Sequence, residues 1–75
     1  MNAKDIKPDM PVVCSEDGQF ASVDHMENDT TIKLKRDDEG NHHYIPLDWV
    51  VSVVKGKVKV DRPGPQAMRE WSTHP

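Results

Sequence analysis

The sequence has little of what disulfide-bonded, membrane-spanning or secreted proteins need. Cys14 is its only cysteine, so an internal disulfide is excluded and a reducing compartment is favoured. Its longest apolar stretch, Trp49–Val54, is interrupted by Ser52 and is far shorter than the ~20 residues of a membrane span. Residues 1–5 lack the apolar region of a secretory signal. We therefore expect a soluble, cytoplasmic protein with no membrane partner.

Clustered basic residues are also missing. The 75 residues include 10 Lys and Arg against 13 Asp and Glu, which gives a net charge of −3 with neutral histidines. Proteins that bind a phosphate backbone need clustered Lys and Arg. Lys55, Lys57 and Lys59 only alternate along one predicted strand, which is typical of a solvated face. The charge balance therefore makes a nucleic-acid partner unfavourable.

Leucine is scarce, with two residues against nine valines. Valine is stiff at its first side-chain torsion and packs well on a pleated surface, so this composition favours strands over a helical bundle. A chain of this mass buries roughly 60% of its unfolded surface, which allows one small core. The length excludes a multi-domain enzyme and a doubly wound nucleotide-binding sheet.

Alternating apolar residues and turn signals predict five or six short strands. The strand segments are residues 10–14, 19–26, 30–35, 42–47, 51–54 and 57–60. Asp17-Gly18 predicts a tight turn in which the glycine supplies a positive φ, and Lys55-Gly56 predicts a short hairpin. Small residues at Ala21 and Ser22 indicate a bulge or sharp bend in the second strand.

The remaining segments are predicted to frame a single domain. Asp48 is a candidate cap for one helical turn holding Trp49 and Val50. Pro65 suits the first position of a helix over residues 66–71, with Ala67, Met68 and Trp71 toward the core. We expect an arm over residues 1–9 anchored by Ile6, one domain over 10–71, and a loose tail over 72–75. The predicted core is Val12, Phe20, Val23, Ile32, Leu34, Ile45, Leu47, Trp49, Val53, Val58 and Val60.

Several stretches resemble one protein family. The segment Val12–Met26, with its Asp17-Gly18 turn and Val23-Asp24-His25, is similar to the opening hairpin of PRC-barrel-like domains. His42–Val50 resembles the signature of a small, uncharacterised bacterial family of single PRC-barrel-like domains. Arg62-Pro63 and Trp71 also fit, so the resemblance covers about residues 6–71. With the strand pattern, it implies a small, strongly bent β-barrel of five to six strands with a short C-terminal helix.

The resemblance implies a fold and no activity. PRC-barrels occur as an assembly module in a photosynthetic reaction-centre subunit and in a ribosome maturation factor, which is an analogy at the level of the fold. The chain departs from the family at Asp9, where glycine is frequent. Cys14 and Ala21 also stand at positions that small residues or glycine often occupy.

Three histidines are the candidate metal ligands. Neutral imidazoles bind zinc, copper or nickel, so His25 with His42 or His43 could hold a divalent metal. His42 and His43 are adjacent in a predicted strand and point to opposite faces, so at most one of them joins His25. A structural or surface role is the commoner alternative for such histidines. We expect no cofactor.

Catalytic residues are not indicated. Asp24-His25 invites comparison with a catalytic pair, but no activated Ser or Cys motif accompanies it. Neighbouring residues of a strand face away from each other, so Asp24 is predicted to be poorly placed to orient His25. Cys14 fits a small core residue better than a reactive thiol. We therefore expect no enzyme.

The predicted function is a non-enzymatic protein-interaction or assembly module. A barrel of this size cannot bury both faces of every strand, which leaves apolar surface for a partner. Tyr44, Trp49 and His42 are the candidate partner-binding residues. The partner is an unidentified protein, and a homo-oligomer is one form the interaction could take. The alternative is a divalent-metal-binding protein that uses His25 with His42 or His43.

Overall fold

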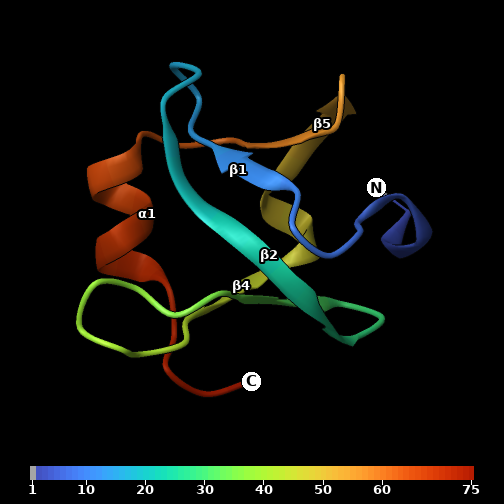
Figure 1. Cartoon of the computed structure of the whole chain (residues 1–75). Coiled ribbons are helices and arrows are strands. Elements are labelled where there is room, and N and C mark those ends of the chain that lie inside the picture. The colour runs from blue at the N-terminus through green and yellow to red at the C-terminus, as the bar shows by residue number, and fades with distance from the viewer. Residues whose placement is uncertain (1) are drawn as a thin grey trace.

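The computed structural model describes residues 2–75 as six short strands, two 3-10 turns and one α-helix (Figure 1). In chain order the elements are η1 (Ala3–Asp5), β1 (Pro11–Val13), β2 (Gln19–Asn28), β3 (Thr31–Leu34), β4 (Tyr44–Pro46), η2 (Leu47–Trp49), β5 (Val50–Val54), β6 (Lys57–Val60) and α1 (Gly64–Glu70). The expected mainly β fold with a short C-terminal helix is confirmed. None of the helices in residues 2–75 is long and apolar enough to cross a membrane.

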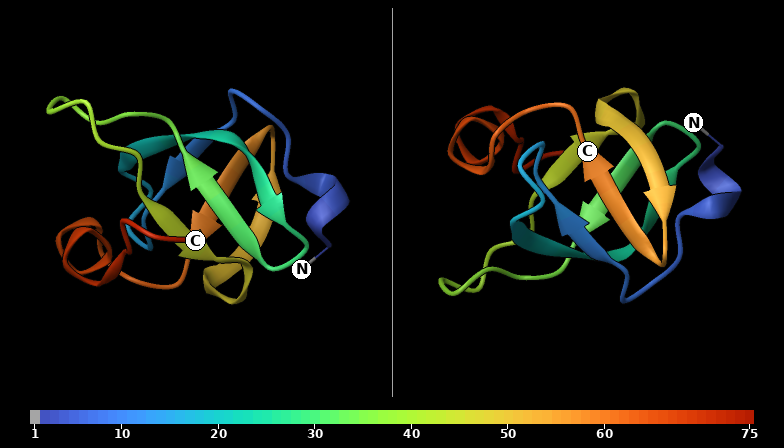
Figure 2. Two further views of the ribbon diagram at one scale, coloured as in Figure 1. Left: turned by 90° about the horizontal axis from the view of Figure 1, so that it is seen from below. Right: turned by 90° about the horizontal axis from the view of Figure 1, so that it is seen from above.

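The strands form one mixed sheet in the order β4-β3-β2-β1-β6-β5. β1 and β6 run parallel, whereas the other neighbours are antiparallel. In both views of Figure 2 the strands curve around a shared interior. The expected closed barrel is not formed, because the order ends at β4 and β5 without a ladder between them. β4 ends at Pro46, which has no N–H to donate, and the chain coils into η2 before β5 begins.

Bulges bend β2, the long curved strand at the centre of Figure 1. Phe20 is left over in the pairing with β1, and Asp24 and Glu27 are left over in the pairing with β3. An extra residue on one strand bends it and increases its twist. The bend predicted around Ala21 is therefore confirmed, whereas the bulges at Asp24 and Glu27 were not predicted.

The two predicted Xaa-Gly turns use their residues differently. At the first turn Asp17 has the positive φ (69°), and the positive φ predicted for Gly18 is wrong. Asp tolerates this left-handed region better than most residues. A Cβ at Gly18 would make only an ordinary 3.6 Å contact with the Cys14 Sγ. Lys55 and Gly56 both have positive φ (55° and 75°), which suits a two-residue hairpin and joins β5 to β6 as predicted.

The helical turns begin earlier than the sequence suggested. Asp48 does not cap η2, because the extended backbone of Pro46 (φ −68°, ψ 143°) already precedes the turn and leaves Asp48 inside it. α1 begins at Gly64, which makes Pro65 its second residue. Pro is tolerated there because the first N–H groups of a helix have no partner within it.

The core follows the predicted set closely. Phe20, Leu47 and Val53 are only partly buried, and Met68, expected to face inward, is 44% exposed. Ala67 and Met68 are neighbours on α1 and point in different directions, so only Ala67 reaches the core. The predicted core residues that are buried are Val12, Val23, Ile32, Leu34, Ile45, Trp49, Val58 and Val60. The anchor Ile6 is buried as well, and so are Val13 and Val50, which were not predicted.

The chain returns to the sheet after α1. Ser72 exchanges two backbone hydrogen bonds with Tyr44, one with its carbonyl as acceptor (2.7 Å) and one with its N–H as donor (3.0 Å). The first residue of the predicted tail therefore covers part of the outer edge of β4. This return places Trp71 beside the loop that connects β3 to β4.

Candidate functional site

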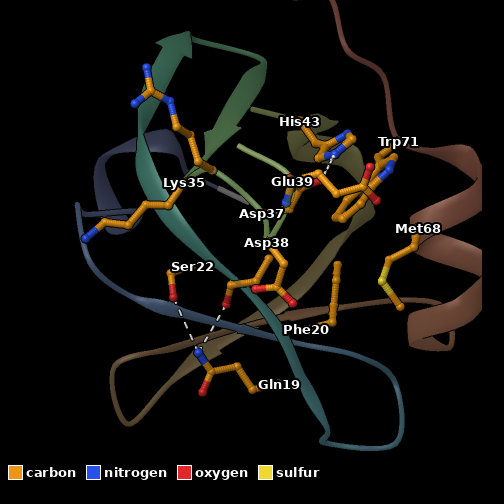
Figure 3. A pocket seen from close by; sticks show the side chains of 12 residues that line it. Gln19, Phe20, Ser22, Lys35, Asp37, Asp38, Glu39, His43, Met68 and Trp71 are labelled. Atoms are coloured by element: carbon orange, nitrogen blue, oxygen red, sulfur yellow. Dashed lines mark hydrogen bonds and ion pairs between the residues drawn. The ribbon is translucent and has the colours of Figure 1, made fainter. Parts of the chain in front are cut away.

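A groove of about 690 Å³ lies between the start of β2, the loop after β3 and the C-terminal end of α1 (Figure 3). Each of its three sides comes from a different part of the chain. The lining residues are Gln19, Phe20, Ala21, Ser22, Lys35, Arg36, Asp37, Asp38, Glu39, His43, Met68 and Trp71. The groove is therefore a product of the tertiary fold rather than of one local motif.

Stacked rings form the wall of the groove. The His43 imidazole lies flat on the Trp71 indole, with centroids 3.8 Å apart and an interplanar angle of 12°. Trp71 in turn meets Phe20 at 6.2 Å and 41°. Ring contacts of this kind add stability beyond the area they bury. With the half-exposed Met68 beside them, these side chains give the groove a continuous apolar side.

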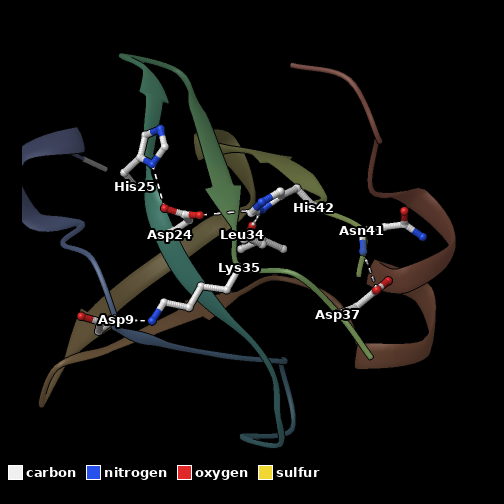
Figure 4. A network of polar contacts seen from close by, with 8 residues as sticks. All are labelled: Asp9, Asp24, His25, Leu34, Lys35, Asp37, Asn41 and His42. Carbon is white, nitrogen blue, oxygen red and sulfur yellow. Dashed lines mark hydrogen bonds and ion pairs between the residues drawn. The ribbon is translucent and has the colours of Figure 1, made fainter. Parts of the chain in front are cut away.

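Asp37 holds the loop beside this wall in place. Its Oδ1 accepts hydrogen bonds from the backbone N–H groups of Glu39 (2.9 Å) and Asn41 (3.0 Å), and its Oδ2 accepts one from His43 Nε2 (2.7 Å). The Asn41 N–H, and then His43, keep the pKa of the Asp37 carboxyl below its ordinary value. Gly40 closes this loop with a φ of 83°. One carboxylate therefore shapes the loop and orients the stacked ring; its contact with Asn41 appears in Figure 4.

Acidic groups without partners line the rim beside the rings. Asp38 and Glu39 are exposed and make no ion pair within the part of the chain that the structure describes. Lys35 lines the same groove, but its ammonium group pairs with Asp9, and this contact raises the pKa of Lys35. Arg36 contributes one exposed positive charge. The rim next to Trp71 therefore carries two free carboxylates.

A second polar cluster surrounds Asp24 on the neighbouring face (Figure 4). His25 Nδ1 donates to Asp24 Oδ1 at 2.9 Å, and His42 Nδ1 donates to the Leu34 carbonyl at 2.8 Å and lies 3.7 Å from Asp24 Oδ2. The expectation that Asp24 cannot reach His25 is wrong, because the bulge at Asp24 breaks the alternation of β2. The hydrogen bond from His25 lowers the pKa of Asp24.

The candidate metal ligands do not converge on one point. His42 lies beside Asp24, whereas the adjacent His43 is stacked on Trp71 and bonded to Asp37. Among residues 2–75, no three His, Cys, Asp or Glu side chains are arranged to hold a metal ion. The Asp24 carboxylate lies between the other two rings, 2.9 Å from His25 Nδ1 and 3.7 Å from His42 Nδ1.

The other predicted residues lie away from the groove. The Trp49 indole is only 8% exposed and lies 3.8 Å beneath the Arg62 guanidinium, which also pairs with Asp61 and Glu70. Tyr44 lines a smaller hollow of about 390 Å³ with Pro46 and Ser72 at the far side of β4. Neither ring forms part of the aromatic wall.

Cys14 is buried at the end of β1 with its thiol facing backbone amides. The N–H of Glu16, followed by those of Gly18 and Gly64, lowers the pKa of this thiol, while burial acts in the opposite direction. The residue packs between the first hairpin and the start of α1. Its surroundings are those of a small interior residue.

Sequence reasoning missed the groove and most of the residues that line it. Trp71 was expected in the core, and neither Trp71 nor Asp37 stands in a motif that indicates a site. One signal was present. An Asp followed three residues later by Gly-Asn is typical of a loop closed by the Asp side chain.

The fold and the groove define a small, mainly β domain with a surface site of mixed aromatic and acidic character. The chain belongs to a family described as uncharacterized proteins conserved in bacteria (DUF2171), whose model matches residues 6–68. Comparison with curated proteins gave no match, and comparison with solved structures gave none either. Membership of an uncharacterised bacterial family is thus confirmed. The match extends from the buried Ile6 to Met68 and includes all six strands.

Proposed function

We propose that the chain is a non-enzymatic protein-interaction module that binds a segment of a partner protein in the groove beside Trp71. The observation that supports this proposal is the pairing of an open apolar wall with two carboxylates that make no ion pair within residues 2–75. Phe20, Met68 and Trp71 form the wall, and Asp38 and Glu39 carry the charges. Apolar surface that a small domain leaves open is typical of a binding site.

The chemistry of the groove favours a partner segment with a basic side chain. Aromatic faces attract Lys and Arg cations, and nearby carboxylates add opposite charge. The methylene stem of such a side chain would cover Met68, and its charged end would meet Asp38 or Glu39. Arg36 repels a basic side chain, but its single positive charge faces the two negative charges of Asp38 and Glu39 at the rim.

Several contacts support a role without catalysis. The two aspartates that contact histidine rings are engaged in structural contacts, Asp24 with His25 and His42 at a bulge and Asp37 with His43 in a loop. Within residues 2–75, no Ser or Cys side chain is hydrogen-bonded to a histidine ring, so the nucleophile–base contact of a hydrolase has no counterpart there.

The binding proposal can be tested with defined peptides and two matched variants. Short peptides that carry Lys or Arg beside an aromatic residue are titrated into labelled protein, with Asp or Glu peptides of the same length as a comparison. We expect the basic peptides to shift the Phe20, Met68 and Trp71 signals. Met68→Lys, which puts a positive charge on the apolar wall, should abolish binding of the basic peptides, whereas Val54→Lys, at another exposed apolar position on a different surface, should leave it unchanged. Equal responses to basic and acidic peptides, or no response to either, would refute the proposal.

We also propose that the sheet is an open variant of a PRC-barrel-like fold. The bent β2, the η2 turn between β4 and β5 and the return of the chain through Arg62-Pro63 support this proposal. Asp9, which stands where that family often has glycine, has a φ of 71° and so adopts a glycine-like backbone. An experimental structure whose strand order departs from that of PRC-barrels would overturn this assignment.

Metal binding is the second candidate, because Asp24 brings His25 and His42 together. Each ring donates from Nδ1, which leaves Nε2 free as a ligand. The test is a zinc titration followed by proton–nitrogen correlation spectra. Saturable shifts around His25 and His42 that vanish in His25→Ala would support this function, and spectra indifferent to zinc would exclude it.

A further inference from the structure

The two edge strands of the sheet differ in whether another segment pairs with their outer side. At the β4 edge, Tyr44 pairs with Ser72, so the returning chain already occupies part of that edge. β5 forms the other edge, where it pairs with β6 and has no neighbour on its outer side among residues 2–75. An unpaired edge strand presents free N–H and C=O groups that can pair with another strand.

β5 lacks the charged residues and the proline that often protect such an edge. Its sequence, Val-Val-Ser-Val-Val, contains no charge and no proline. Val51 and Val54 are 55% and 57% exposed, and they are two of the three exposed large apolar side chains in residues 2–75. The third, Met68, lies on α1, which is across the molecule from β5 in Figures 1 and 2. The β5 edge is therefore an apolar surface separate from the groove.

Charges at the two ends of β5 indicate what could cover it. Asp48 lies just before the strand and Lys55 directly after it, and both are exposed. Neither makes an ion pair with any residue from 2 to 75. If two copies of β5 pair antiparallel about a two-fold axis between Val51 and Ser52, the Asp48 end of each copy meets the Lys55 end of the other. Parallel pairing would place like charges together.

We propose that β5 is a self-association edge, on which a second copy of this chain adds its own β5 in antiparallel orientation. The pairing extends the sheet across both copies and buries the exposed faces of Val51 and Val54. It also creates two Asp48–Lys55 pairs from charges that are unpaired in one copy. A two-fold interface is self-complementary, and this strand has the required pattern: apolar in the middle, with opposite charges at its ends. Val51 is the extra residue of the bulge in β5, and residues 52–54 form the regular part of the edge.

Charge reversal tests the proposal without disturbing the fold. Lys55 has a φ of 55°, a conformation that Asp tolerates well, so Lys55→Asp keeps the hairpin turn. Asp48 makes no capping bond and no ion pair within residues 2–75, so Asp48→Lys removes no interaction of either kind there. Each single variant places like charges at both ends of the interface and should weaken dimerisation by about tenfold or more. The double variant restores opposite charges and should recover the wild-type dissociation constant.

The measurement is sedimentation velocity over a wide range of protein concentration, at low and at high salt. Val54→Asp should give a monomer, and Met68→Asp and Glu39→Lys, which alter the groove, should leave the dissociation constant unchanged. Chemical-shift changes on dilution should be confined to residues 48–55 and their neighbours on β6. A wild-type chain that stays monomeric at every concentration overturns the proposal, and so does a dimer that tolerates both single charge reversals. Because the groove variants are scored separately, failure here leaves the peptide-binding proposal standing, and the reverse also holds.

Discussion

At the scale of single residues, Asp9 combines a costly backbone conformation with a useful side chain. Its φ of 71° lies in the left-handed region, which non-glycine residues adopt only at a cost. Its N–H donates to the Val23 carbonyl at 2.9 Å, which ties the N-terminal arm to β2. Its carboxylate pairs with Lys35, which draws that ammonium group away from Asp38 and Glu39 at the groove (Figure 4).

The backbone contribution of Asp9 can be separated from its charge by comparing two variants. Asp9→Gly and Asp9→Ala both lose the carboxylate, so they differ mainly in the cost of the positive φ. We expect Asp9→Gly to be the more stable by roughly 1 kcal/mol. Urea unfolding of both variants measures this difference. Equal stabilities would mean that the turn relaxes to a negative φ once the ion pair with Lys35 is lost.

Asp37 makes the stability of the chain depend on pH. Hydrogen bonds from Asn41 and His43 hold the pKa of Asp37 below its ordinary value in the folded state. At mildly acidic pH the unfolded chain therefore binds more protons at this site than the folded chain does. The stabilisation is complete above the ordinary Asp pKa and is lost as the pH falls through the lower, folded value.

Replacing Asp37 should remove this part of the acid sensitivity. We expect Asp37→Asn to have a lower melting temperature than the wild type at neutral pH, with the two melting temperatures converging as the pH falls below the ordinary Asp pKa and through the lower, folded one. Thermal unfolding at a series of pH values measures the effect. Asp38→Asn is the matched control. Its melting temperature should change with pH as that of the wild type does, since Asp38 makes no ion pair in residues 2–75. A difference in melting temperature between Asp37→Asn and the wild type that stays the same at every pH would contradict this account.

At the scale of elements, α1 is held to the sheet by a few side chains. Ala67 is fully buried, Arg62 between β6 and α1 pairs with Glu70, and Trp71 stacks on His43. Arg62 also covers the Trp49 ring, so one guanidinium connects the helix to the core. The bond to Asp61 and then the one to Glu70 raise the pKa of Arg62, which therefore stays charged. The groove keeps its shape only while α1 stays docked.

Removing the Trp71 ring should loosen α1 more than the sheet. Trp71→Ala loses its contacts with His43 and Phe20, and we expect a cost of about 1–2 kcal/mol because the ring is only partly buried. Hydrogen exchange at α1 amides should accelerate more than exchange in β2 or β6. Trp71→Phe, which keeps a stacking ring, should show a smaller effect. Uniform loss of protection over the whole chain would show that α1 and the sheet unfold together.

The strands and hairpins were predictable because their signals are local. Alternation of Ile32 and Leu34 with lysines marks β3, and Lys55-Gly56 marks the turn between β5 and β6. The bulge at Asp24 was not predictable in this way. It depends on the register that β2 adopts against β3, and the residue type at position 24 does not indicate a bulge. The same bulge explains why the expected separation of Asp24 from His25 failed.

At the scale of the whole molecule, the groove is assembled from segments distant in the chain. Phe20 from β2, Asp37 from the loop after β3, and Trp71 after α1 meet only because the last segment returns to β4. Sequence patterns report on neighbours along the chain, so this meeting could not be anticipated. A closed barrel was expected from the family resemblance. It does not form, because β4 ends at Pro46 and makes no ladder with β5.

Because the core is small, substitution of Trp49 should lower the free energy of unfolding strongly. A native chain of this length has a stability of roughly 0.05–0.15 kcal/mol per residue, or about 4–11 kcal/mol in total. Trp49→Ala removes a ring that is 92% buried and should cost about 3–5 kcal/mol, a large share of that total. The variant should therefore unfold at a much lower urea concentration and be partly unfolded at physiological temperature. Met68→Ala, which shortens a half-exposed side chain, should change the unfolding free energy by no more than about 0.5 kcal/mol. Similar losses in both variants would mean that Met68 is covered in solution, as it would be if a second molecule occupied the groove.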